Sequence, residues 1–343
     1  MMLANFKNFL LGIDKNIEKE KVYGLALSSL AQDKMFEVLE TRDFVTFHQR
    51  LMELSKLPHG LGLGVSLMAQ INIAGGVLFH CKDKSDTAKE LFGKVINGDS
   101  TVSLGVSETG WKGRIRNIQT TLKQNGDDFL LEGSKAFFTN GGNSSHFIVI
   151  AKSESNEFKT VLVPKDSNIE ITKFSLDFAI EATHAKITFH DTIVKRDQIL
   201  PISYEEHALD FRFSEILSLN CLFSGYGRNL LKEIFTNNKD NLSERKNSEL
   251  INLDTIFQFF QDRLILLSKL KDNVENLESF YPFGSETVKT YFYETLSEIH
   301  PKDSLIEKYP DLKLFEMDDP MLQMLRKRDR EKRFDFLKNS FRK

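Results

Sequence analysis

Residues 105–142 read GVSETGWKGRIRNIQTTLKQNGDDFLLEGSKAFFTNGG, and this stretch decides the fold. Turn signals at 125–127 (Asn-Gly-Asp) and 141–143 (Gly-Gly-Asn) enclose a run rich in aromatic and aliphatic residues. Such a run between two turns is typical of β-structure, and we expect a strand at Phe129–Leu131.

The pattern on either side of this stretch predicts the domain order. Apolar residues recur at helical spacing in residues 1–100 and again from about residue 204, whereas residues 101–200 alternate short β-rich runs with turns. The expected helices are Ile17–Thr41, Phe44–Leu54, 60–79, Asp86–Val95, Phe211–Phe235 and Leu250–Leu270, with a polar loop at Asn237–Asn247. The expected strands are Thr101–Val106, Phe129–Leu131, Phe147–Ala151, Thr160–Val163, Ile169–Thr172 and Ala185–Phe189. We therefore expect an α+β protein with a helical domain (1–100), a β-domain (101–202) and a second helical domain (203–343).

Length and composition limit the class of protein. The chain has 343 residues, of which 41% are hydrophobic and 28% charged, and its net charge is −3. These values exclude a disordered chain, collagen, a disulfide scaffold and a polytopic membrane protein. The near-neutral charge argues against a nucleic-acid partner. The basic run Arg326–Arg333 is either a solvated helix face or a contact for phosphate groups.

Cysteine usage and one apolar stretch bear on the compartment. Cys81 and Cys221 form no CxxC pair, which fits a reducing cytoplasm, and no Cys/His spacing predicts a metal site. Residues 60–79 carry no charge and have the length of a membrane span. Five glycines and the polar Ser66 and Gln70 favour a buried helix instead. We therefore expect a cytoplasmic protein with no membrane partner and no metal.

The stretch at 105–142 resembles the middle domain of the acyl-CoA dehydrogenase family. That domain runs from T-E-P-x-x-G-S-D through G-D-x-Y-x-L-N-G-x-K to W/F-I-T-N-G. Residues 107–108 stand for T-E, residues 126–135 for the hairpin and residues 137–141 for the flavin-side strand. Residues 183–194 are similar to the strand that closes this domain. A chance match of so many spaced positions is improbable.

The resemblance implies a fold, an activity and partners. The fold would be acyl-CoA dehydrogenase-like, with the β-domain as a barrel or sandwich and the C-terminal helical bundle shortened. The implied activity is FAD-dependent α,β-dehydrogenation of an acyl-CoA thioester in fatty acid metabolism, with a Glu as base. An electron-transfer flavoprotein would accept the electrons, and the chain would assemble as a homo-dimer or homo-tetramer.

The resemblance also implies which residues contact FAD. Phe137 would lie against the isoalloxazine ring. Thr139 and Ser107 would hydrogen-bond its N5 and pyrimidine edge, and Val106 would offer backbone contacts. Taken alone, Phe137 reads as a core residue, and Thr139 and Ser107 as ordinary strand residues.

Three further residues complete the expected cofactor site. Gly113 replaces the family's Ser that helps hold a phosphate-bearing ligand, and the flanking cations Lys112 and Arg114 are substitutes for that role. Trp111 either covers the flavin edge or packs ordinarily. Arg245 is the residue that survives from the family's R-x-x-F-G segment.

The general base has two candidates. Glu316 follows an aromatic residue and precedes an apolar-Gln helix start, as does the Glu of the family's Y-E-G-T segment, although Met317 replaces the glycine. Glu215 stands ten residues before Gly225, the spacing used by a smaller branch of the family. Glu316 is the first choice and Glu215 the second, and a surface carboxylate is the alternative for each.

One family motif is missing. The G-G-x-G-Y segment, whose glycines let backbone approach the cofactor pyrophosphate, has no counterpart, and Thr287–Ile299 stands in its place. Two alternatives therefore stay open beside the dehydrogenase. One is a catalytically degenerate acyl-CoA-binding or partner protein on the same fold. The other is a flavin-dependent monooxygenase, which needs no Glu base.

Overall fold

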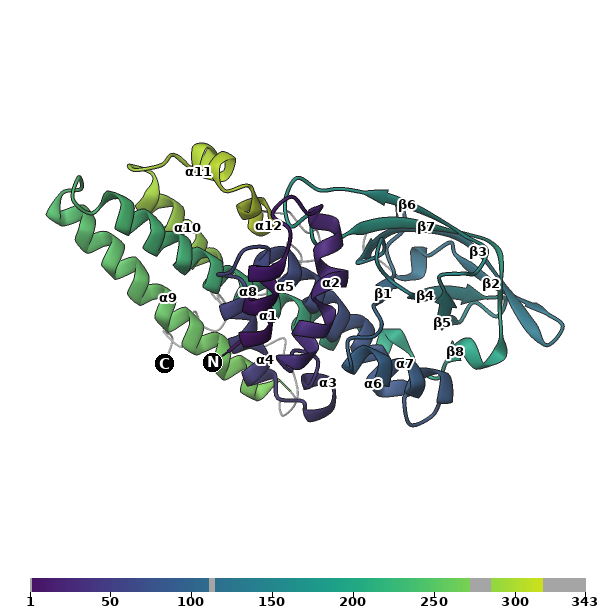
Figure 1. Ribbon diagram of the computed structural model, residues 1–343. Helices are drawn as coiled ribbons and strands as arrows, with labels where there is room; N and C mark the ends of the chain where they lie inside the picture. The colour runs from purple at the N-terminus through teal and green to yellow at the C-terminus, as the bar shows by residue number, and fades with distance from the viewer. Residues whose placement is uncertain (1, 111–114, 272–284, 317–343) are drawn as a thin grey trace, which may run out of the picture.

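A computed structural model describes residues 2–110, 115–271 and 285–316. Helices lie toward one end of the molecule and a twisted sheet lies at the other (Figure 1). The helical, β, helical order is as the sequence predicts. Trp111, Gly113, the cations beside them and the basic run at 326–333 fall outside the described residues.

Short helices form the N-terminal part. They are α1 (Ala4–Gly12), α2 (Lys19–Gln32), α3 (Val38–Thr41), α4 (Phe44–Leu54), α5 (Gly60–Ala69), the π-helix η1 (Gln70–Gly75), α6 (Gly76–Cys81) and α7 (Asp86–Ile96). Asp43 and Ser85 cap α4 and α7 through their side chains. The single helix expected over Ile17–Thr41 is wrong, because Lys34 adopts a left-handed φ of 63° that ends α2 and starts a turn before α3.

The uncharged stretch from residue 60 is one continuous rod of α5, η1 and α6. By length and composition Gly60–Cys81 is apolar enough to cross a membrane, but 89% of its most apolar window is buried inside the molecule. Its polar residue Gln70 is paired within the core, because Tyr23 Oη donates to Gln70 Oε1 at 2.8 Å. Packing against other elements therefore accounts for the apolar character of this stretch.

The β-domain is one eight-stranded sheet. Its strands are β1 (Val102–Gly105), β2 (Thr121–Asn125), β3 (Asp128–Thr139), β4 (His146–Ser153), β5 (Phe158–Pro164), β6 (Ile169–Phe174), β7 (His184–Val194) and β8 (Ile199–Leu200). The order is β6-β7-β3-β2-β4-β5-β8, and β1 pairs with β4. The expected strands are present. The strand expected at Phe129–Leu131 is the start of the 12-residue β3, which pairs with β2 as the predicted hairpin.

One face of the sheet forms the core of the β-domain. Phe138, Phe147 and Phe189 are buried there, with the Phe138 and Phe147 rings in an edge-to-face contact at 5.5 Å. Side chains alternate between the faces of a strand. Phe137 and Thr139 therefore belong to the opposite face.

Long helices form the C-terminal part. They are α8 (Tyr204–Asn238), α9 (Glu244–Leu270), α10 (Ser285–Leu296), α11 (Lys302–Lys308) and α12 (Lys313–Glu316). The polar loop expected at Asn237–Asn247 is shorter than predicted, because the Ser243 side chain caps α9 by accepting from the Lys246 N–H. Residues from both helical parts share one buried core. The two parts therefore flank the β-domain in sequence but pack together in space.

Candidate functional site

Four side chains gather where β3, β6 and β7 meet the helices, and we call them the site face: Phe137, Thr139, Phe174 and His184. In the register, His184 stands directly opposite Thr139 on β3 and opposite Phe174 on β6. Directly opposed residues of antiparallel strands point to the same side of the sheet. The Phe137 ring centroid lies 4.5 Å from that of His184 and 5.4 Å from that of Phe174. The site face is thus an aromatic surface with one hydroxyl and one imidazole.

Buried polar atoms without partners surround the site face. Within the described residues, His184 Nδ1, Thr183 Oγ1 and Asn140 Oδ1 have no hydrogen-bond partner. A buried polar group left in this state costs about 1–3 kcal/mol, so such groups are usually satisfied by a ligand or water. Burial also lowers the pKa of His184 to about 4, which leaves its ring neutral near pH 7. These atoms fit a flat ligand with a polar edge.

Asn140 fastens the end of β3 to the helices. Its Nδ2 donates to the Ser66 carbonyl of α5 at 2.8 Å, and its backbone has a left-handed φ of 67°. The two glycines that follow leave no room for side chains, because a Cβ on Gly141 would lie 2.8 Å from Ala185 Cβ. The end of the flavin-side strand is therefore fixed against both β7 and α5.

A buried ion pair fixes the loop beside the strand. Glu108 and Lys135 have side-chain exposures of 6% and 0%, and Lys135 Nζ lies 2.6 Å from Glu108 Oε1. Lys135 Nζ also donates to the Val106 carbonyl at 3.3 Å, and the Ala136 N–H donates to the Ser107 carbonyl at 2.8 Å. Val106 and Ser107 are thus held next to β3, beside Phe137.

The same carboxylate is also bonded to residues 119 and 120, just before β2. Glu108 accepts from the backbone N–H groups of Gln119 and Thr120 and from Thr120 Oγ1. Burial alone would raise the pKa of Glu108, but these donors and Lys135 bring it below its usual range. Burial lowers the pKa of Lys135 to about 8. The ion pair with Glu108 thus gives Lys135 a structural role.

The two candidate bases lie on different elements. Glu316 ends α12, where Lys302 of α11 pairs with it and Tyr293 of α10 lies close by. Glu215 lies on α8 and pairs with Arg212 one turn earlier. Its charge also raises the pKa of the buried Tyr204, although burial is the larger cause.

Arg245 does not lie on the site face. It is 86% exposed and pairs with Glu249 on its own helix, α9, at 3.0 Å. The segment expected to replace the glycine clamp contains α10, whose Phe292 is fully buried against the helical core. In the described part of the chain, this segment is therefore used for packing.

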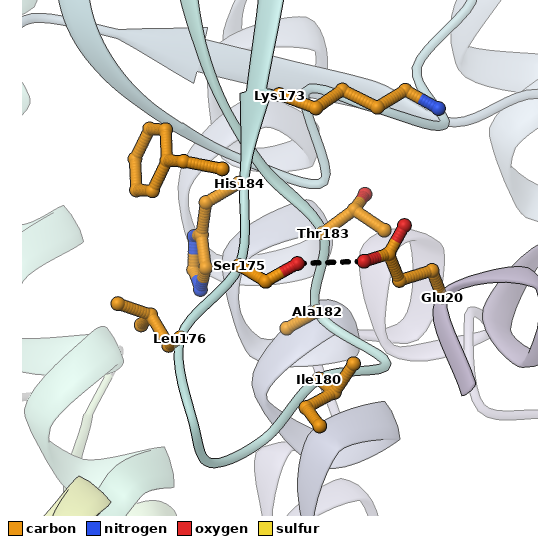
Figure 2. Close-up of a pocket in the computed structure, with 9 residues that line it drawn as sticks. Glu20, Lys173, Ser175, Leu176, Ile180, Ala182, Thr183 and His184 are labelled. Carbon is orange, nitrogen blue, oxygen red and sulfur yellow. Dashed lines mark hydrogen bonds between the residues drawn. The ribbon is translucent and has the colours of Figure 1, made fainter. Parts of the chain in front are cut away.

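A small, mostly apolar pocket of about 10 Å³ lies beside the site face between α2, β6 and β7, and Phe174 and His184 are among the residues that line it. Ser175 Oγ donates to Glu20 Oε1 at 2.7 Å across it. Figure 2 shows Thr183 and Glu20 pointing toward each other on one side of the loop that joins β6 to β7, with the His184 ring on the other. The pocket has room for about one water molecule, so it is not itself a substrate cavity.

Comparison with known proteins finds the acyl-CoA dehydrogenase family in the β-domain that carries the site face. The sequence profile of the acyl-CoA dehydrogenase middle domain matches residues 103–192. A curated relative, the probable medium-chain specific acyl-CoA dehydrogenase 2 of Caenorhabditis briggsae, is 26% identical over 154 residues, which cover 41% of this chain and 36% of that protein. Residues 103–192 are therefore similar to the acyl-CoA dehydrogenase middle domain, and this chain spans about a third of the length of that relative.

Solved structures show the same fold over most of the chain. Glutaryl-CoA dehydrogenase from Mycobacterium smegmatis, in complex with FADH2, has a TM-score of 0.72 at 14% identity and covers 87% of this chain and 82% of its own. Butyryl-CoA dehydrogenase from Megasphaera elsdenii has a TM-score of 0.72 at 15% identity and covers 94% of this chain and 91% of its own. The predicted helical, β, helical architecture is thereby confirmed.

The sequence missed two members of the site face. The pattern included His184 only as part of the closing strand, and Phe174 followed a strand expected to end at Thr172. The signal that joins them to Thr139 is the pairing register of β3, β6 and β7. Periodicity within single strands does not contain that register.

Proposed function

We propose that this protein is an FAD-dependent oxidoreductase that removes two hydrogens from the α and β carbons of an acyl-CoA thioester. The observation that carries the proposal is the site face: an aromatic surface with Phe137 and Thr139 at its centre, bordered by buried polar atoms that lack partners. FAD-bound relatives on this fold and the family's middle domain support the choice of cofactor.

In this proposal each group has a defined task. Phe137 contacts the isoalloxazine ring, Thr139 bonds its polar edge, and Val106 and Ser107 border it. FAD held by these residues would supply the hydride acceptor for the β carbon. A glutamate carboxylate takes the α proton, and fixed donors hold the charge on the thioester oxygen. The saturated thioester becomes an α,β-unsaturated thioester, and the proton and hydride together balance the two-electron oxidation.

We keep Glu316 as the first candidate for the base and Glu215 as the second. Glu316 adjoins the loop after the site face, because Asp311 accepts from the Ala179 N–H and Lys313 pairs with Asp177. Its partner Lys302 is half exposed, and exposed pairs are weak enough to be broken for catalysis.

Glu215 is the candidate on α8. It lies near Tyr204, which packs against the small core that contains Val106. Substituting each of the two carboxylates in turn therefore shows which one removes the α proton.

The test is flavin uptake by the purified protein, followed by anaerobic titration with acyl-CoAs of several chain lengths. We expect a yellow protein that acyl-CoA bleaches. A protein that stays colourless after added FAD would overturn the proposal. Glu316→Gln should bind FAD and acyl-CoA but bleach at least about 100-fold more slowly, a loss typical of a missing general base. If Glu316→Gln bleaches normally and Glu215→Gln does not, the base is Glu215.

Electron acceptor and assembly belong to the same proposal. We expect an electron-transfer flavoprotein as acceptor, a role in fatty acid metabolism in the cytoplasm, and a homo-dimer or homo-tetramer. Exposed apolar side chains at Ile251, Phe259 and Leu266 on α9 support the assembly. Sedimentation of wild type and Phe259→Lys tests it, since the variant should dissociate.

The second candidate is an acyl-CoA-binding or partner protein that has lost the chemistry. Two observations favour it: Arg245 pairs with Glu249, and α10 stands where the glycine clamp is expected. Flavin uptake separates the candidates, because this one predicts acyl-CoA binding to a colourless protein.

A further inference from the structure

The feature that carries a further inference is the ring of His184. It is 5% exposed, although it lies on the site face rather than in the core of the β-domain. Phe137 and Phe174 pack against it, with ring centroids 4.5 Å and 5.9 Å away. Thr139 stands directly opposite in the register. No sequence motif assigned His184 a role.

A second buried histidine in this chain shows what a purely structural imidazole looks like. His48 is fully buried, and both its ring nitrogens are satisfied: Nδ1 lies 2.7 Å from Ser268 Oγ and Nε2 lies 2.9 Å from Ser218 Oγ. His184 differs because its Nδ1 is buried without a partner in the described part of the chain. A histidine placed only for packing would not need a nitrogen in that position.

The surroundings keep the His184 ring neutral. Burial lowers its pKa to about 4, so near pH 7 Nδ1 is either a donor or an acceptor, as the tautomer decides. A neutral imidazole beside Phe137 and Thr139 matches the polar edge of a ring system that has both donors and acceptors. It would repel neither an uncharged nor an anionic flavin.

We infer that His184 is a cofactor-contacting residue, whose Nδ1 hydrogen-bonds the polar edge of the flavin that occupies the site face beside Phe137 and Thr139. This inference rests on the proposed function. It adds a residue that sets the affinity and the spectrum of the bound ring, because a hydrogen bond to the ring edge changes the ring's electron distribution.

The experiment compares FAD titrations of wild type, His184→Phe and His184→Asn. Phenylalanine keeps the ring contact with Phe137 and removes the nitrogen, whereas asparagine places a polar atom near the position of Nδ1. We expect His184→Phe to raise the FAD Kd about tenfold and to shift the flavin absorption bands. His184→Asn should recover most of the affinity. His190→Phe is the matched control, because His190 lies on the same strand with its side chain half exposed.

The outcomes distinguish a failure of the proposed function from a failure of the His184 contact. Wild type that binds no FAD overturns both the proposed function and this inference. Wild type that binds FAD while His184→Phe matches it in Kd and spectrum overturns the inference alone. Should His184→Phe fail to fold, ¹⁵N-histidine NMR of wild type replaces it. Added FAD should then shift the His184 Nδ1 resonance and leave the His190 resonances in place, and an unshifted His184 would refute the contact.

Discussion

The β-domain and the C-terminal helices hold their charged residues in opposite ways. In the β-domain, the pair of Glu108 and Lys135 is almost fully buried. Four further hydrogen bonds hold it, from two backbone N–H groups and one hydroxyl to Glu108 and from Lys135 to one backbone carbonyl. In the helices, the pair of Arg245 and Glu249 leaves the arginine 86% exposed. The first pair fixes Val106 and Ser107, which border the site face. The second pair joins two residues of the same helix, α9, and fixes no other element.

This difference determines how strongly each pair constrains its two residues. A buried pair constrains both partners, because removing either leaves an unpaired charge in a low-dielectric interior. A solvated pair constrains neither. The buried pair lies within residues 103–192, the part of the chain that is similar to the family's middle domain, whereas the solvated pair lies outside that part.

The largest expected effect breaks the buried pair. Glu108→Gln should destabilise the protein by about 3–5 kcal/mol, because Lys135 would be left buried without its partner. Arg245→Ala in the helices should change stability by about 1 kcal/mol or less. Urea unfolding of both variants measures the contrast. Adding Lys135→Met to Glu108→Gln should restore part of the loss, and equal losses for Glu108→Gln and Arg245→Ala would contradict the comparison.

The next effect tests packing in the two regions. A Cβ on Gly105 would lie 2.1 Å from Cζ of the buried Phe138, so Gly105→Ala should cost about 3 kcal/mol. Gly93 lies in α7 with nothing within 4 Å of the added atom. Gly93→Ala should therefore stabilise the protein by up to about 1 kcal/mol, because alanine is the better helix former. Thermal unfolding measures both variants. Melting temperatures that change in the same direction in both would show that the β-domain is not the more closely packed region.

These contrasts also show which features of the fold and the site could be predicted from the sequence. The strand at Phe129–Leu131 was predictable, because turn residues and β-rich runs are local signals, and the hairpin at 126–135 and the strand at 137–139 followed from the family resemblance. The burial of Lys135 was not, because a lysine in a strand ordinarily points to solvent, and only the long-range approach of Glu108 makes its burial tolerable. The place of His184 was hidden for the same reason: it depends on the register between β7 and β3.

A third prediction concerns the contribution of a buried histidine in the helices, His48, to the loss of stability in acid. Burial, with a smaller contribution from the charge of Lys271, lowers the pKa of His48 to about 3. The unfolded chain takes up this proton near pH 6.5, but the folded chain does so only near pH 3. The contribution of His48 to the free energy of unfolding is therefore fully present above pH 6.5. It falls as the pH drops below that value, by roughly 2 kcal/mol between pH 6.5 and 5.

The variant His48→Gln isolates this contribution. It should be less stable than wild type at pH 7, because glutamine does not satisfy both Ser218 and Ser268 as the ring does. It should also lose roughly 2 kcal/mol less between pH 6.5 and 5. Denaturant midpoints at several pH values give the slope. His190→Gln, at an exposed site in the β-domain, should keep the wild-type slope, and an unchanged slope in His48→Gln would place the acid sensitivity elsewhere.

The smallest expected effect compares how much the β-domain and the C-terminal helices contribute to FAD affinity. Thr139→Val removes one hydroxyl from the site face while keeping the shape of the side chain, so the FAD Kd should rise about fivefold to tenfold, the value of one hydrogen bond. Arg245→Ala should change the same Kd by less than about twofold, since this guanidinium pairs with Glu249 and does not lie on the site face. Fluorescence titration of FAD measures both values. A large effect of Arg245→Ala beside wild-type binding by Thr139→Val would mean that the helices hold the cofactor, for instance across an assembly interface, and that the β-domain only supports the fold.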